Sequence, residues 1–263
     1  MKMRTCAVAG MFYPNDPSHL EQLLEKFFSV VKPGKKSPLG IVSPHAGYIY
    51  SGQVAANAFG AIPPDFSGTF VVIGPSHRGY LSSVSSIPWE TPLGVVDPDR
   101  EFIEALELET DELSHKDEHS IEVQLPFLHR FRPDVRIVPV ALGRLSLEEC
   151  RALGEGAADA IAGDPERPLL VASTDMSHYV PDAVARKKDR LAIERMLALD
   201  PEGLYTTVRV ERISMCGVLP ATVVLFAARR LGATSARLVR YATSGDVSRD
   251  FEQVVGYAGL AFR

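Results

Sequence analysis

The sequence has few cysteines, and they lie far apart. Cys6, Cys150 and Cys216 are the only three in 263 residues. An odd number at such spacing fits neither a disulfide framework nor the paired cysteines of a zinc ribbon. Both classes are therefore excluded, and we expect the chain to work in the reducing cytoplasm.

Long apolar runs and an excess of basic residues are also missing. No apolar stretch approaches the roughly 20 residues that span a bilayer, and Tyr13 and Pro14 interrupt the N-terminal apolar residues before they form a signal peptide. The net charge is −5, with acidic and basic residues interspersed, which excludes the basic footprint of a nucleic-acid-binding protein. We therefore expect no membrane and no nucleic acid among the partners.

Several familiar site motifs are absent as well. The sequence contains no G-x-S-x-G elbow, no Walker loop, no G-x-G-x-x-G after the first strand and no H-E-x-x-H. Serine hydrolase, nucleotide-phosphate and zincin functions are therefore unsupported.

What the sequence does contain is a regular alternation of apolar strands and amphipathic helices. Helices are expected at residues 17–31, 52–62, 97–108, 146–163, 182–199 and 218–232, and strands at 39–43, 69–74, 135–143, 168–174, 236–246 and 254–263. Strands separated by helices predict an α/β sandwich, with a mainly parallel or mixed central sheet flanked by helices. We expect one domain over residues 1–263.

Three of the predicted strands are followed closely by a histidine. His45 stands in "SPHAGY", His77 in "GPSHRGY" and His178 in "STDMSHY", and Gly47 and Gly79 allow tight turns beside the first two. Taken alone, His45 or His77 is better explained as a loop histidine bonded to a carbonyl. Ligands bind at the carboxyl ends of strands in open α/β sheets, so the three together predict a common site.

Histidines at such a site serve as metal ligands or as general acids and bases. Two imidazoles need at least one further ligand to hold a divalent ion, and Asp175, Glu122, His178 and Cys216 are the candidates. Asp175 and His178 are three residues apart, which places them on one face if a helix begins there. The carboxylate would then raise the basicity of the imidazole, making His178 a good general base.

The segment "HKDEHSIEVQLPFL" is the most polar of the candidate regions. His119 lies four residues after His115 and three before Glu122, and either spacing puts two metal-ligand side chains on one helical face. The alternative is a charged helix start, with Asp117 and Glu118 complementing the helix dipole at a solvated end. His115 has no further support as a site residue.

Cys216, in "ISMCGVLP", precedes a glycine at the start of a strongly apolar predicted helix. The helix dipole would stabilise a thiolate at that position. The alternative is a small buried apolar residue, which is the usual role of a free cysteine.

These segments together resemble the Memo (MEMO1) family, in particular the AmmeMemoRadiSam system protein B type. The matching motifs are "AVAGMFYP", "SPHAGYIYSG", "VVIGPSHRGY", "DEHSIEVQLPFL", "STDMSHY" and "MCGVLP". They follow the family's order from one end of the chain to the other, so the resemblance covers essentially the whole sequence.

The resemblance implies a fold similar to that of class III (LigB-type) extradiol dioxygenases, which use non-haem Fe(II) to open catechol rings. It makes His45, His77 and Cys216 the metal ligands. It also places in the same pocket the remaining candidate residues, Asp175, His178, His119, Glu122, Tyr50 and Arg78, the first two as catalytic groups. Cysteine stands where the dioxygenases have a carboxylate, so copper or zinc are candidates beside iron.

Three functions remain open at this point. The first is a metal-dependent oxidoreductase for a small, possibly aromatic molecule, in a pathway shared with a radical SAM protein and an AMMECR1-domain protein. The second is a binding or adaptor module with a vestigial pocket; Arg78 is the only arginine within the strand-end motifs, which weakens a role in anion recognition. The third is a hydrolase with Cys216 as nucleophile and His178 as base.

Overall fold

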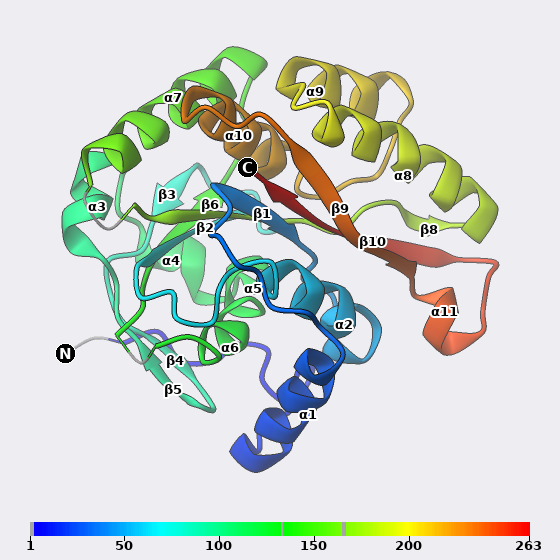
Figure 1. The fold of residues 1–263 in the computed structure, drawn as a ribbon, viewed down its shortest axis with the longest axis horizontal. Helices are drawn as coiled ribbons and strands as arrows, with labels where there is room; N and C mark the ends of the chain where they lie inside the picture. The colour runs from blue at the N-terminus through cyan, green and yellow to red at the C-terminus, as the bar shows by residue number, and fades with distance from the viewer. Residues whose placement is uncertain (1–2, 133, 165–166) are drawn as a thin grey trace.

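The computed structural model describes residues 3–132, 134–164 and 167–263 and is built around one eight-stranded mixed sheet (Figure 1). The strands in spatial order are β3 (Ser83–Val84), β6 (Arg136–Leu142), β2 (Thr69–Pro75), β7 (Leu169–Ser173), β1 (Gly40–Ser43), β10 (Val254–Phe262) and β8 (His178–Val180), and β9 (Ala236–Thr243) pairs with β10. Strands β6, β2, β7 and β1 are mutually parallel, whereas β3, β8, β9 and β10 pair antiparallel. The predicted α/β sandwich with a mixed, centrally parallel sheet is confirmed.

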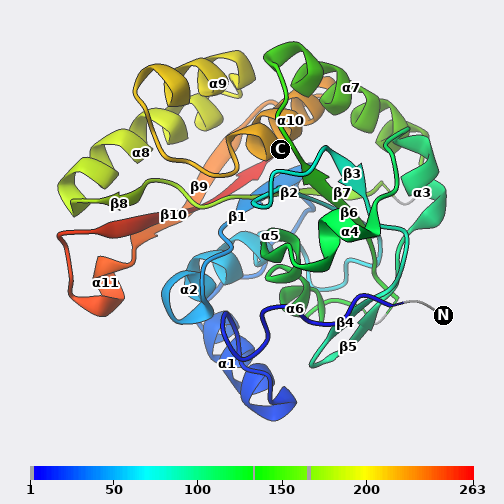
Figure 2. The same cartoon turned by 180° about the vertical axis from the view of Figure 1, so that it is seen from behind.

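Helices cover both faces of this sheet, as Figures 1 and 2 show from opposite sides. One face carries α3 (Arg100–Ala105), α7 (Leu147–Gly163), α8 (Asp182–Leu197), α9 (Pro201–Val210) and α10 (Val218–Arg230). The other carries α1 (Pro17–Ser29), α2 (Tyr48–Phe59), α5 (His119–Glu122) and α6 (Leu125–Leu128). The smaller elements are β4 (Trp89–Thr91), β5 (Gly94–Val96), α4 (Glu112–Lys116) and α11 (Gly245–Ser248).

Two apolar clusters lie between the sheet and these helix layers. Successive residues of β2 alternate between them, so that Val71 and Ile73 join the cluster under α7 and α10, whereas Phe70 and Val72 join the one under α2. All seven residues of β2 are buried. A strand covered on both faces reads as a continuous apolar run, which explains why "TFVVIG" lacks the alternation of a surface strand.

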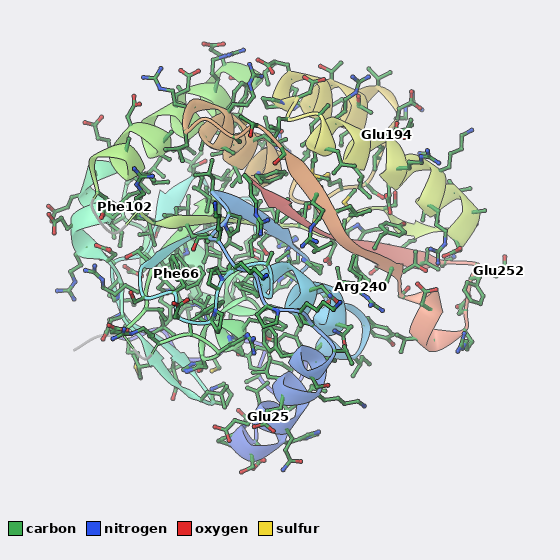
Figure 3. The ribbon with its side chains drawn as sticks, viewed as in Figure 1. Glu25, Phe66, Phe102, Glu194, Arg240 and Glu252 are labelled. Atoms are coloured by element: carbon green, nitrogen blue, oxygen red, sulfur yellow. The ribbon has the colours of Figure 1, made fainter. Side chains whose placement is uncertain are left out.

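Charged side chains lie mainly at the periphery. Glu252 lies at the rim of the molecule in Figure 3, Glu25 lies on α1 and Glu194 on α8, and all three are exposed. Within the described residues, no helix combines the length and hydropathy needed to cross a bilayer.

Most predicted elements are present, with shifted ends. The helix predicted at 52–62 begins at Tyr48, directly after Gly47, and the helix predicted at 97–108 is only Arg100–Ala105, capped by Asp99. The strand predicted at 236–246 ends at Thr243. Sequence reasoning missed α9, although Asp200 caps it and a proline opens it.

Candidate metal centre

Three adjacent parallel strands end at the candidate site. Strand β7 lies between β2 and β1, and its last residue, Ser173, pairs with Ser43 at the end of β1. The chain continues from β1 to His45, from β2 to His77 and from β7 to Asp175. The strand ends therefore meet at one edge of the sheet, as predicted.

Cys216 reaches this edge from a different element, the turn before α10. A Cβ atom on the next residue, Gly217, would lie 2.3 Å from Thr174 Cβ and 2.5 Å from the carbonyl oxygen of Ser173. Only glycine permits so close an approach, and the Gly217 N–H donates to Thr174 Oγ1 at 2.9 Å. This contact sets the thiol beside the end of β7.

The side chains of His45, His77 and Cys216 form a compact group. Their potential ligand atoms all lie within 4.8 Å of one another, and His45 Nε2 is 3.3 Å from Cys216 Sγ. A tetrahedral metal with ordinary bond lengths to nitrogen and sulfur would hold such a pair about 3.5 Å apart. The group therefore fits a single metal ion.

A chain of hydrogen bonds fixes the tautomer of His45. The Ser173 hydroxyl donates its only proton to the carbonyl oxygen of Ser120 at 2.5 Å, and it accepts from the Gln124 amide at 2.8 Å. His45 Nδ1, 2.9 Å from the same hydroxyl oxygen, must then be the donor. This leaves the lone pair on Nε2, which faces Cys216. Burial, together with the neighbouring histidines His119 and His77, lowers the pKa of His45 well below 6.5, so the imidazole is neutral.

A carboxylate orients His77 in a similar way. His77 Nδ1 donates to Glu118 Oε1 at 2.9 Å, and the His77 backbone N–H donates to Oε2 at 2.7 Å. Burial raises the pKa of Glu118, but the hydrogen bonds from His77 and Ser120 outweigh it and lower this pKa to about 2. A carboxylate bonded to the far nitrogen is the usual support of a metal-ligating histidine. Nε2 of His77 is left for a metal.

Sequence reasoning did not find Glu118, Ser173 and Gln124 as supports of the site. The alternative interpretation of this segment places Glu118 at a solvated helix end. The residue is only 1% exposed, because it is enclosed between His77 and α5. In the sequence, the sign that Glu118 supports the site was its position directly before His119. For Ser173, the sign was that a polar residue ends an otherwise apolar strand.

The thiol of Cys216 is protonated in the metal-free protein. Burial, followed by the negative charge of Asp175, raises its pKa to about 12. The predicted stabilisation of a thiolate is therefore not met in this state, because burial and the Asp175 charge raise the pKa of the thiol. The Asp175 N–H lies 3.2 Å from the sulfur and donates to it.

Asp175 and His178 do not share a helical face as the sequence suggested. The chain enters the short strand β8 at His178, and Tyr179 has a φ of 55°, an uncommon backbone conformation for a residue with a side chain. Asp175 is 4% exposed, accepts the His45 N–H at 2.9 Å, and has a pKa raised to about 6 by burial. Its carboxylate thus holds the turn that carries His45.

Contacts with Ser214 position His178. His178 Nδ1 lies 2.8 Å from the Ser214 carbonyl oxygen and 2.9 Å from that of Met176. Because both partners only accept, Nδ1 carries the proton and Nε2 keeps a lone pair. The His178 backbone N–H also donates to Ser214 Oγ at 2.7 Å. Ser214 precedes Cys216 by two residues, so the two loops are joined.

His119 adds a third ring beside the candidate ligands. It stacks on His77 with ring centres 4.4 Å apart, and its centre is 5.4 Å from that of His45. Burial lowers the pKa of His119 to about 4. Arg78 and Tyr50 are exposed.

Glu122 serves a different purpose from the one its spacing suggested. The carboxylate is fully buried and pairs with Arg4 Nη1 at 2.6 Å. It also accepts from the backbone N–H groups of Ala7 and Val8 and from the Tyr13 hydroxyl at 2.6 Å. These partners all belong to the N-terminal segment, which Glu122 therefore fastens to α5.

His115 lies away from the cluster. The polar segment spans the end of α4 and the whole of α5 and α6. His115 belongs to α4, where it is buried with its ring centre 5.8 Å from that of Trp89. The prediction that His115 and His119 share a helical face is therefore wrong, because Asp117 and Glu118 interrupt the helix between them.

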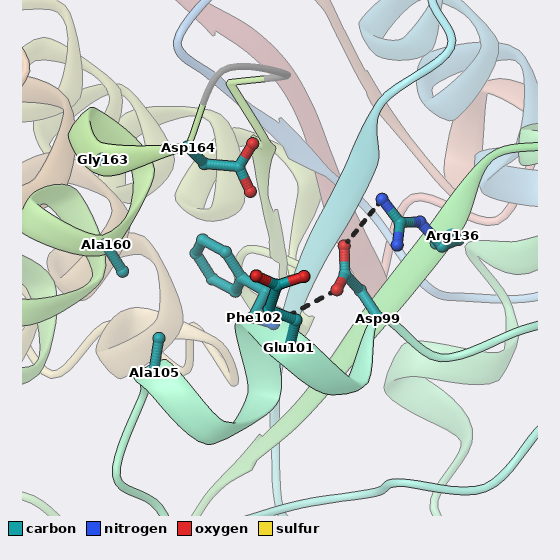
Figure 4. Close-up of a pocket in the computed structure, with 8 residues that line it drawn as sticks. All are labelled: Asp99, Glu101, Phe102, Ala105, Arg136, Ala160, Gly163 and Asp164. Atoms are coloured by element: carbon teal, nitrogen blue, oxygen red, sulfur yellow. Dashed lines mark hydrogen bonds and ion pairs between the residues drawn. The ribbon is translucent and has the colours of Figure 1, made fainter.

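The opposite edge of the sheet holds a different cavity, of about 330 Å³ (Figure 4). Asp99 and Arg136 form an ion pair there with a separation of 3.4 Å, and Asp99 also accepts from Thr69 and from the Phe102 N–H. Arg136 and Thr69 begin their strands. This cavity is thus remote from the strand ends that carry the histidines.

The fold and the site together define an α/β protein with a histidine and cysteine cluster at the carboxyl edge of its parallel strands. The chain belongs to the Memo-like protein family, whose sequence model matches residues 4–261. The resemblance found in the motifs is thereby confirmed.

Relatives in archaea and bacteria match over nearly their whole length. A MEMO1 family protein of Methanosarcina barkeri is 43% identical, covering 98% of this chain and 99% of its own. One from Aquifex aeolicus is 40% identical, with 100% of both chains covered. The crystal structure of an uncharacterized Escherichia coli K12 protein is similar in fold, with a TM-score of 0.51 and 13% identity, over 84% of this chain and 98% of that one.

Proposed function

We propose that this protein is a redox enzyme that binds a transition metal through His45, His77 and Cys216. The observation that carries the proposal is the convergence of the three side chains, with the far nitrogens of both imidazoles already bonded to Ser173 and Glu118. Ligands held in one tautomer and one orientation are typical of metal sites.

Iron is the metal we propose first. Two imidazoles and one anionic ligand leave coordination positions open for a substrate, as in non-haem Fe(II) enzymes. A thiolate is softer than a carboxylate, so copper and zinc are the other metals that this set of ligands suits. A cation beside Cys216 would also reverse the pKa shift caused by burial, because metal binding deprotonates a coordinating thiol.

His178 is the group that we propose to move protons. The metal, when bound, would supply Lewis acidity and electron transfer. The Nε2 atom of His178 carries a lone pair in the neutral ring, because Nδ1 is held by two carbonyl oxygens. Asp175 is proposed to act with it, by fixing the turn that presents His45.

Substrate class and partners are proposed from family resemblance. We propose a small oxidisable aromatic molecule as substrate, by likeness to LigB-type dioxygenases. The family's association with a radical SAM protein and an AMMECR1-domain protein suggests both as pathway partners in the cytoplasm.

Metal content tests the proposal directly. Protein purified anaerobically from iron-supplemented cells is analysed by mass spectrometry as wild type, His45→Ala and Cys216→Ser. We expect near-stoichiometric iron in the wild type and loss of most of it in both variants. Cys6→Ser is the matched control, because Cys6 donates to the Glu90 carbonyl oxygen and is not one of the candidate ligands.

Two other outcomes separate the alternatives. A wild type without a transition metal would support the binding-module function with a vestigial pocket. Rapid alkylation of Cys216 in the metal-free protein would support the hydrolase, since a buried thiol with its pKa raised to about 12 reacts slowly.

A further inference from the structure

An apolar groove of about 710 Å³ lies between the N-terminal segment and the first turn of α2. Residues 10–16 and residues 47–50 line it, together with His19 and Leu23 of α1. The N–H of Tyr48 donates to the carbonyl oxygen of Phe12 at 2.7 Å, which joins the two walls. The groove is thus built by packed elements.

The lining of the groove suits hydrocarbon. Tyr13 and Tyr48 are almost fully buried, whereas Met11 is 72% and Ile49 is 68% exposed. Asp16 is the carboxylate in the lining, and it already accepts the His19 N–H as the cap of α1. Exposed apolar side chains around a concave surface are typical of a binding site.

The groove adjoins the candidate metal centre through Phe12. The ring of Phe12, in its lining, is 4.8 Å from the ring of His119, which in turn stacks on His77 at 4.4 Å. The other wall follows His45 in the chain, because Gly47 and Tyr48 connect the end of β1 to α2. A substrate tail that leaves the metal centre along the edge of the Phe12 ring would therefore enter the groove.

We propose that this groove binds the apolar tail of the substrate, whose oxygen-bearing head lies at His45, His77 and Cys216. The inference rests on the proposed function and narrows its substrate class. The substrate is then an amphipathic molecule, with a metal-chelating aromatic head and a hydrocarbon tail, rather than a free ring of the size of catechol.

Alkylcatechols of increasing length test the proposal. Iron-loaded protein is titrated anaerobically by calorimetry with catechol, 4-methylcatechol and 4-hexylcatechol. A fully buried methylene improves affinity roughly fourfold. Because the groove is open on one side, we expect the hexyl compound to bind about tenfold or more tightly than the methyl compound. Equal affinities would overturn the proposal.

Two variants place the effect in the groove. In Ile49→Asp and Met11→Asp the ratio of hexyl to methyl affinity should fall below about twofold, since a charge replaces an exposed apolar group at the rim. Val30→Asp is the control, because Val30 is 70% exposed just beyond α1 and does not line the groove. A tail preference that survives both groove variants would contradict the assignment.

Separate readouts distinguish failure of the groove from failure of the metal site. In metal-free protein carrying ¹³C-methyl methionine, 4-hexylcatechol should shift the Met11 resonance whether or not the head binds iron. No binding of catechol to iron-loaded protein, with the Met11 shift retained, would count against the proposed function alone. The protein could instead show equal affinity for all the alkylcatechols and form a dimer that Ile49→Asp dissociates. That result would assign the groove to a second copy of the chain and overturn the substrate subsite.

Discussion

Replacing Glu122 by glutamine removes one charge from a buried ion pair while hardly changing the volume of the side chain. The carboxylate accepts from four groups of the N-terminal segment, at distances of 2.6–3.0 Å. A glutamine would keep one acceptor oxygen and turn an NH₂ group toward two of the donors. Arg4, whose side chain is only 3% exposed, would remain buried without its counter-charge.

The expected loss of unfolding free energy follows from the unpaired charge of Arg4 and from the N–H groups that lose their acceptor. Removing one partner of a buried ion pair typically costs about 3–5 kcal/mol, and an unpaired buried N–H lies in the range of about 1–3 kcal/mol. Arg4 keeps its bonds to the carbonyl oxygens of His115 and Glu118 and its stacking on Trp89, so we expect a total near the lower figures, about 3–4 kcal/mol. That is a large share of the stability of an ordinary domain.

Urea unfolding followed by tryptophan fluorescence measures this loss, because Trp89 is the only tryptophan and lies against Arg4. Glu25→Gln, exposed on α1, is the control and should stay within about 0.5 kcal/mol. The double variant Arg4→Met with Glu122→Gln should lose at least about 2 kcal/mol less than the sum of the single changes. An additive double variant, or a single loss below about 1 kcal/mol, would refute the idea that a buried ion pair fastens this segment.

Three further changes test other parts of the structure. Burial lowers the pKa of His115 from 6.5 to about 4. The neutral ring therefore contributes its full stability above pH 6.5, and this contribution is lost as the pH falls toward 4. His115→Gln should reduce the difference in unfolding free energy between pH 7 and pH 4 by about 3 kcal/mol. Gly217→Ala should lower metal content and destabilise the protein by about 1–3 kcal/mol, since its Cβ would overlap Thr174; unchanged thermal melting would contradict this. Ser173→Ala should weaken metal binding about 10–100-fold in a competition assay with a chelator, because it frees the tautomer of His45.

The strand ends could be predicted because their causes are local. An apolar run that stops at a proline or serine shows where a buried strand leaves the sheet, and parallel strands leave it at a common edge. His45 and His77 were found in this way. The prediction that Gly47 allows a tight turn was less accurate, since its φ is −55° and it is the N-cap residue of α2. Gly79 does have a positive φ, of 76°.

The supports of the site could not be predicted because they depend on packing between distant segments. Glu118 and His77 are 41 positions apart in the chain, and Ser173 and His45 are 128 apart. Spacing favoured Glu122, which shares a short helix with His119, over Glu118, which precedes that helix. A period of three or four residues shows which side chains share a face but not what that face touches.

The position of Cys216 follows from how the two carboxylates near the site are used. Glu118 has both oxygens occupied by His77 and Ser120, and Asp175 accepts the N–H that begins the His45 turn. Both carboxylates thus position the histidine segments, whereas the sulfur lies 3.3 Å from His45 Nε2 in the group of three that also contains His77. A thiolate contributes the same charge of −1 as a carboxylate, so the site differs from a two-histidine, one-carboxylate centre in softness rather than in charge. Metal preference and redox potential, more than affinity for divalent ions in general, are therefore the properties that Cys216 should control.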